Sequence, residues 1–230
     1  MDDFYILHSF DFFGTFVFAI SGALIAYEQR RGGFRAAFYA ALTALGGGTM
    51  RDLLLAHKPV FWVRSPAYLW IAIAGGLLTF VLAQFARLQR EKLWFAEILS
   101  LGIFSIVGTQ IAISIMPSTS WLDWLIPPLM GLLTAVGGGM VRDVIDGEIP
   151  FVMQHPDYAF ASFTSGSLYR LLMTAHIPAI YAISGAIAIA FLFISSPLRN
   201  LVLIRKPVRQ MRGRTMSYKS TGYKTKYRSF

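Results

Sequence analysis

The sequence predicts an all-α integral membrane protein with seven transmembrane helices, arranged as two inverted three-helix repeats plus a seventh helix. Three observations lead to this prediction. The 230-residue chain is 55% hydrophobic and only 14% charged, which is too apolar for an ordinary soluble domain. Its apolar runs are long enough to cross a bilayer. The unusual phrase GGG-x-x-R-D also occurs twice, beginning at Gly46 and at Gly137.

Seven runs without Asp, Glu, Lys or Arg mark the candidate spans. The second and fifth runs each end in a glycine triplet. The sixth is short and interrupted by Ser and Thr, and the seventh is expected to begin near Pro178. In order, the runs cover residues 12–27, 36–50, 65–86, 98–122, 124–141, 158–169 and 171–198.

Basic residues between the runs test the number of spans. They cluster at residues 30–35, at residues 87–92 and in a tail from Arg199 that holds ten Lys/Arg and no acid. Seven spans with the N-terminus outside place all three clusters in the cytoplasm, as the positive-inside rule requires. Six spans, the main alternative, would place the tail on the wrong side. We therefore predict seven spans, with the N-terminus outside and the C-terminus in the cytoplasm.

The basic tail also accounts for the net charge of +9. Because it follows a membrane-like body, we expect it to face anionic membrane lipid or to be a disordered solvated segment, and not to bind nucleic acid.

The repeated phrase belongs to a longer duplication. The stretch KPVFWVRSPAY (58–68) resembles IPFVMQHPDY (149–158), and DFFGTFVFAISGALIA (11–26) lines up with EILSLGIFSIVGTQIA (97–112). Each unit holds three spans, an odd number, so the second unit must enter the membrane from the opposite side. We expect a first repeat over residues 1–90, an inverted repeat over 91–176, a seventh helix over 177–198 and a basic cytoplasmic tail over 199–230.

Inverted repeats usually place a binding site or pore between equivalent helices, here spans two and five. Glycines can kink or break a helix and expose carbonyl oxygens, which are ligands of the kind that cations use. Alternatively, the glycines only allow close helix packing. The candidate pore and kink residues are Gly46, Gly47, Gly48, Gly137, Gly138, Gly139, Thr43 and Thr134.

Charged residues near the span ends are candidate mouths or gates of such a path. Charge inside a membrane is costly unless it is paired or lines water. Symmetry suggests the pairs Arg51–Glu97 or Asp11–Arg142, and the alternative is that these groups anchor the helices at the interface. The candidates are Arg51, Asp52, Arg142, Asp143, Asp11 and Glu97.

Enzyme motifs are absent from the sequence: it has no G-x-S-x-G, HExxH, Walker or Rossmann pattern. An intramembrane hydrolase could pair Asp52 with Asp143, but the predicted topology puts them at opposite faces of the bilayer. We predict no enzyme, no cofactor and no resident metal.

With both phrases placed on inverted repeats, residues 1 to about 198 resemble prokaryotic trimeric intracellular cation (TRIC) channels, which belong to a bacterial family carrying the "glycine transporter" domain. The resemblance implies a homotrimer with one path for K⁺ and Na⁺ in each subunit, bounded by helices kinked at the two triplets. The residues alone leave two alternatives open: a secondary carrier for glycine or a similar small zwitterion, and a non-transporting membrane scaffold.

Overall fold

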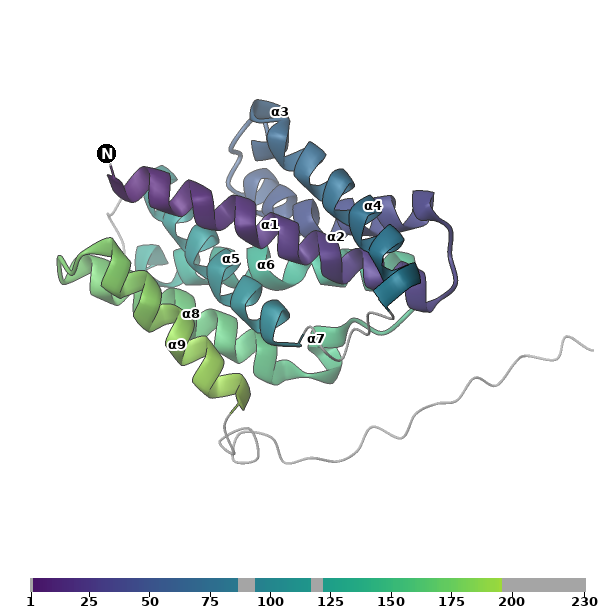
Figure 1. Ribbon diagram of the computed structural model, residues 1–230. Helices are drawn as coiled ribbons and strands as arrows, with labels where there is room; N and C mark the ends of the chain where they lie inside the picture. Colours follow the sequence, from purple (N-terminus) through teal and green to yellow (C-terminus); the bar gives the residue numbers. More distant parts are fainter. Residues whose placement is uncertain (1, 87–93, 117–121, 196–230) are drawn as a thin grey trace, which may run out of the picture.

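The chain folds into a bundle of helices (Figure 1). The computed structural model describes residues 2–86, 94–116 and 122–195, and within these ranges no strand occurs. The predicted tail and the basic cluster at 87–92 lie outside the described residues. Seven helices in the described ranges have 17 residues or more: α1 (Asp2–Glu28), α2 (Gly33–Leu54), α4 (Ala67–Ala86), α5 (Trp94–Ile115), α6 (Leu122–Ile145), α8 (Pro156–Thr174) and α9 (Ala179–Ser195). The four-residue helices α3 (Phe61–Arg64) and α7 (Phe151–Gln154) follow α2 and α6.

Each predicted span overlaps one of the long helices. Three stretches are both long and apolar enough to cross a membrane: His8–Glu28, Ala67–Phe85 and Leu122–Ile145. The apolar stretches Ser100–Ile115 and Ala179–Ile194 are shorter. The two remaining helices, α2 and α8, carry buried charges and depend on their neighbours to cover them. Accordingly, α2 packs against α1, α4 and α6, and α8 packs against α5, α6 and α9.

Helix packing in the first half of the chain recurs in the second half. Helices α1, α2 and α4 pack against one another, and so do α5, α6 and α8. The halves meet where α1 contacts α5 and where α2 contacts α6, while α9 packs on α5 and α8. Phe18 of α1 and Phe104 of α5, which occupy equivalent positions in the aligned repeats, lie with ring centroids 4.8 Å apart. Equivalent positions therefore meet at the centre of the bundle.

The ends of α2 and α6 are built alike. Ala56 and Gly147, 91 residues apart, have φ angles of 51° and 76°. This left-handed conformation closes a helix C-terminus. The amide of His57 donates to the carbonyl of Asp52 at 2.8 Å, and the amide of Glu148 donates to that of Asp143 at 2.9 Å. Each helix therefore stops at the same point after its Arg-Asp pair.

Helices α2 and α6 cross in opposite directions at the two glycine triplets. A β-carbon added to Gly47 would lie 2.1 Å from the carbonyl oxygen of Thr134, and one added to Gly138 would lie 2.0 Å from that of Thr43. The two contacts are equivalent in the two repeats, because Gly47 and Thr43 lie 91 residues before Gly138 and Thr134. Neither helix is broken at its triplet, because both are continuous from end to end. No break is observed at either triplet, where the glycines bring the two backbones into contact. A kink at the glycines stays a prediction.

We expect Gly138→Ala to destabilise the protein, because the new methyl group cannot fit against the carbonyl oxygen of Thr43. Overpacking of this kind costs about 1–3 kcal/mol. Gly139→Ala is the matched control in the same helix, since the nearest described atom to its added β-carbon is a side-chain nitrogen of Arg142 at 3.6 Å. Thermal unfolding in detergent should show a lower midpoint for Gly138→Ala alone. Equal midpoints for the two variants would contradict the close crossing.

Candidate functional site

The site is built around the α2–α6 crossing, beginning with one threonine on each helix. The hydroxyl of Thr43 donates to the carbonyl of Tyr39 at 2.7 Å, and that of Thr134 donates to the carbonyl of Met130 at 2.6 Å. Each threonine faces a glycine of its own half: a β-carbon on Gly22 would meet the hydroxyl oxygen of Thr43 at 2.6 Å. Both predicted threonines thus lie at the crossing, where their backbone carbonyl oxygens face Gly47 and Gly138.

The first Arg-Asp pair forms a clamp at the end of α2. Nε and Nη2 of Arg51 donate to Oδ1 of Asp52 at 2.9 and 2.7 Å. The other carboxylate oxygen, Oδ2, accepts the backbone N–H of Phe61 at 2.7 Å. Since Phe61 is the first residue of α3, Asp52 fixes the start of that short helix. Both charged side chains are buried. Each neutralises the other at a place where water cannot screen their charges.

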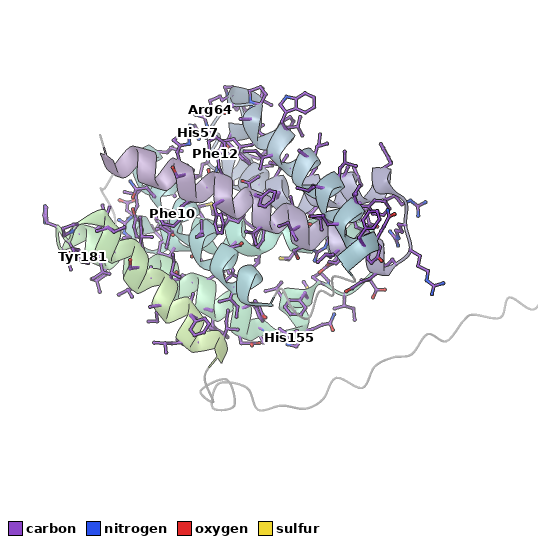
Figure 2. All side chains as sticks on the ribbon, in the orientation of Figure 1. Phe10, Phe12, His57, Arg64, His155 and Tyr181 are labelled. Carbon is purple, nitrogen blue, oxygen red and sulfur yellow. The ribbon has the colours of Figure 1, made fainter. Side chains whose placement is uncertain are left out.

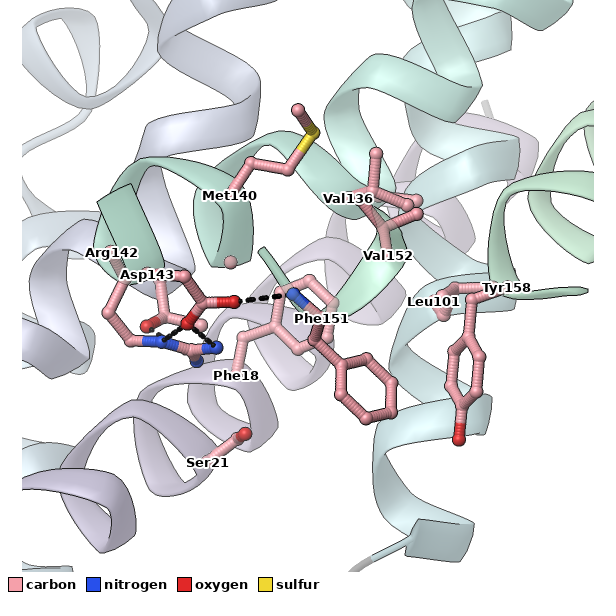
Figure 3. Close-up of a pocket in the computed structure, with 13 residues that line it drawn as sticks. Phe18, Ser21, Leu101, Val136, Met140, Arg142, Asp143, Phe151, Val152 and Tyr158 are labelled. Atoms are coloured by element: carbon pink, nitrogen blue, oxygen red, sulfur yellow. Dashed lines mark hydrogen bonds and ion pairs between the residues drawn. The ribbon is translucent and has the colours of Figure 1, made fainter. Parts of the chain in front are cut away.

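The second pair repeats this clamp at the end of α6, as Figure 3 shows. Nε and Nη2 of Arg142 donate to Oδ1 of Asp143 at 2.9 and 2.7 Å, and Oδ2 accepts the backbone N–H of Phe151 at 2.8 Å. Phe151 is the first residue of α7. Arg142 also donates through Nη1 to the hydroxyl of Thr43 at 3.3 Å. The second clamp therefore ties α6 to both α7 and α2.

In these contacts each arginine binds the aspartate beside it in sequence. Asp11 is buried in α1 and accepts a hydrogen bond from the hydroxyl of Tyr68 at 2.7 Å, so its described partner is Tyr68 and not Arg142. Glu97 lies in α5, but its side chain falls outside the described part of the structure.

The two clamps lie at different ends of the bundle. Helices α3 and α7 are on opposite sides in Figure 1. In Figure 2, His57 and Arg64, which follow the first triplet, lie at the top, and His155, which follows the second, lies at the bottom. Each Arg-Asp pair thus supports its own junction, α2 to α3 or α6 to α7, and the two junctions lie far apart. The two aspartates do not form one shared carboxylate site.

A cavity of about 70 Å³ lies beside the second clamp. It has room for a few water molecules. Its polar lining comes from Ser21, Thr43, Arg142 and Asp143, and its apolar lining comes from α1, α5, α6, α7 and α8 (Figure 3). The cavity reaches the crossing, because Thr43 and Gly139 belong to its wall. Four of the predicted site residues therefore line the same small cavity: Thr43, Gly139, Arg142 and Asp143.

Three side chains of the site were not predicted from the sequence. Phe61 and Phe151 sit on the clamps, and their signal was the aromatic patch shared by the two aligned stretches. Asp146 had no such signal. It accepts a hydrogen bond from the hydroxyl of Tyr39 at 2.7 Å and pairs with Arg31 at 2.5 Å, which joins the end of α6 to the α1–α2 turn. In the sequence, Arg31 indicates only which side of the membrane its loop faces.

Comparison with known proteins places the chain in a family. The model of the family described as "Glycine transporter" matches residues 8–84 and again residues 94–174. The chain belongs to this family. The inner membrane protein YadS (UPF0126) of Escherichia coli K12 is 38% identical over 165 residues, which is 71% of this chain and 77% of YadS. A UPF0126 membrane protein of Vibrio cholerae is 37% identical over 70% of this chain and 66% of its own length.

Solved structures share the fold. The chain resembles a TRIC trimeric intracellular cation channel orthologue from Rhodobacter sphaeroides with a TM-score of 0.74 and 28% identity, over 85% of this chain and 96% of that one. A prokaryotic TRIC channel crystallised in 0.5 M KCl gives a TM-score of 0.71 at 25% identity, over 87% of this chain and all of that one. The chain is therefore a membrane protein of the TRIC channel fold, and its matches are channel and transporter proteins, not enzymes.

The clamps predict a graded loss of stability. Asp52→Asn leaves the buried guanidinium of Arg51 without a counter-charge, a change that typically costs about 3–5 kcal/mol. Asp143→Asn should cost less, since the Asp143 side chain keeps 13% of its surface exposed and that of Asp52 keeps none. Unfolding in detergent would rank the variants, with the exposed Glu148→Gln as a control expected to change little. If all three variants unfold alike, the clamps do not carry the stability assigned to them.

Proposed function

We propose that this protein is a channel for monovalent cations, K⁺ and Na⁺, which conducts passively through a path in each subunit beside the crossing of α2 and α6. The observation that carries the proposal is the cavity beside the second clamp. In this cavity, hydroxyl oxygens and a carboxylate lie next to the backbone of a glycine. The fold is shared with TRIC cation channels.

The cavity chemistry suits a partly hydrated cation. A space for a few waters lets an ion keep part of its hydration shell, and the hydroxyl groups of Ser21 and Thr43 supply oxygen atoms. Asp143 and Arg142 neutralise each other, so this pair adds no net positive charge that would repel a cation. The wall of the cavity therefore neither repels a cation nor holds it tightly, as conduction requires.

The glycine contact gives the path a means of opening. Helices that pack through interlocking side chains resist sliding, since ridges of one helix fill grooves of the other. At the centre of the triplets few side chains interlock, because Gly47 and Gly138 meet backbone atoms of the other helix directly. We infer that α2 and α6, continuous in this state, can kink at their glycines. A small shift of α6 against α2 then widens the passage, and this shift is the gating motion.

Assembly and topology form part of the proposal. We infer a homotrimer, supported by the trimeric description of the Rhodobacter relative in structure. Bacterial relatives described as inner membrane proteins support a location in the inner membrane, surrounded by lipid. The two matches to one family model and the recurring contacts support two inverted three-helix repeats with seven spans. The loop charges support an external N-terminus and a cytoplasmic C-terminus.

A carrier for a small zwitterion such as glycine is the second candidate. A cavity that reaches the crossing beside one clamp is also what alternating access would produce in one of its states. The paired Arg142 and Asp143 offer partners for a carboxylate and an ammonium group. A membrane scaffold, the third possibility, has no need of a hydrated cavity.

Bilayer recording separates these functions. We expect the purified protein in a KCl gradient to give discrete unitary currents that reverse near the K⁺ equilibrium potential. The Gly47→Ala/Gly138→Ala double variant should alter the currents, because both methyl groups press on the crossing. Liposomes loaded with labelled glycine form the parallel assay. Silent bilayers together with glycine exchange would establish the carrier, and the absence of both fluxes would favour the scaffold.

A further inference from the structure

The two ends of the proposed path are not equivalent, although their backbones match. At the first triplet, the ring of Phe61 covers Gly48: a β-carbon there would lie 2.6 Å from Cε1 of that ring. At the matching position Gly139, the nearest described atom is Nη2 of Arg142 at 3.6 Å, and the ring of Phe151 stays beyond 4 Å. One aromatic residue is seated on its glycine and the other is not.

A hydrogen bond holds the seated ring. The indole N–H of Trp62, next to Phe61, donates to the hydroxyl of Thr49 at 3.0 Å. That hydroxyl donates in turn to the carbonyl of Leu45 at 2.7 Å, so α3 is fastened to the backbone of α2. The second half carries Val152 and Met140 at the equivalent positions, and neither side chain can form this bond. Both line the cavity instead.

Burial of the two clamps follows the same asymmetry. Asp52, beneath Phe61, has no exposed side-chain surface, whereas Asp143, beneath Phe151, keeps 13%. The guanidinium carbon of Arg51 also lies 5.7 Å from the centre of the Phe61 ring, a distance at which a cation and an aromatic face attract each other. The first end is therefore packed and held by a hydrogen bond, and the second end opens onto the cavity.

We propose that Phe61 is a gate that closes the path at the α2 end, latched by the Trp62–Thr49 hydrogen bond, while the cavity at the α6 end stays accessible. The inference rests on the proposed function. Breaking the latch frees α3, the Phe61 ring leaves Gly48, and the α2 end acquires the space that its counterpart already has. In the proposed topology the gate faces the outside and the cavity faces the cytoplasm.

Conduction gives the first test. Trp62→Phe keeps an aromatic ring but removes the N–H donor, and loss of one hydrogen bond should raise the ratio of open to closed time about fivefold. Phe61→Ala should raise it further, and the matched Phe151→Ala should raise it less. Circular dichroism and size-exclusion chromatography confirm folding, and Trp62→Phe carries the test if Phe61→Ala does not fold. An unchanged ratio in Trp62→Phe, or a larger effect in Phe151→Ala, would overturn the gate.

Thiol labelling tests the gate without any ion flux. The chain contains no cysteine, so single thiols can be introduced by Val136→Cys at the cavity wall and by Leu45→Cys at the equivalent buried position. In nanodiscs, where both faces are exposed, a charged thiol reagent should modify position 136 at least about tenfold faster than position 45. Adding Trp62→Phe should accelerate position 45 alone.

The outcomes separate the gate from the channel. Equal labelling rates at the two positions, together with normal currents, would overturn the gate and leave the channel proposal standing. The predicted labelling pattern with silent bilayers would reject the channel and keep Phe61 as the closed side of a carrier.

Discussion

The direct contact between the backbones of α2 and α6 is the constraint on which the rest of the structure depends. Gly47 and Gly138 each press against a carbonyl oxygen of the other helix, an approach that any side chain would prevent. The contact fixes the crossing point of the two halves. It also places Thr43 and Thr134 at the crossing, with an Arg-Asp pair following each triplet.

Each Arg-Asp pair joins the end of its glycine-containing helix to the short helix that follows. In each clamp, one carboxylate oxygen neutralises the neighbouring arginine and the other holds the first amide of a short helix. That helix begins with a phenylalanine, so the position of the aromatic ring depends on the end of the glycine helix. The motif GGG-x-x-R-D thus combines a close crossing with a support for an aromatic residue, which explains why charged residues follow an apolar run.

Much of this could be predicted from the sequence because hydropathy and internal repetition are local signals. The duplicated phrase located the equivalent helices and the threonines at the crossing. The role of the glycines was only half predicted, since a triplet can break a helix or allow close packing, and the choice depends on the opposite helix. The ion pairs were not predictable from symmetry, because an arginine and the next residue on a helix meet only when side-chain rotation brings them together. The difference between Phe61 and Phe151 depends on Trp62 and Thr49, whose bond joins positions 13 residues apart.

The central claim is that cations pass through the cavity beside Asp143, and modification of its wall during recording tests this most directly. A positively charged thiol reagent applied to Val136→Cys channels should abolish the unitary current as the label fills the cavity, while Ala175→Cys, exposed in the turn between α8 and α9, should label without any change in current. Full conductance through channels labelled at position 136 would contradict the account, because the ions would then be following another route.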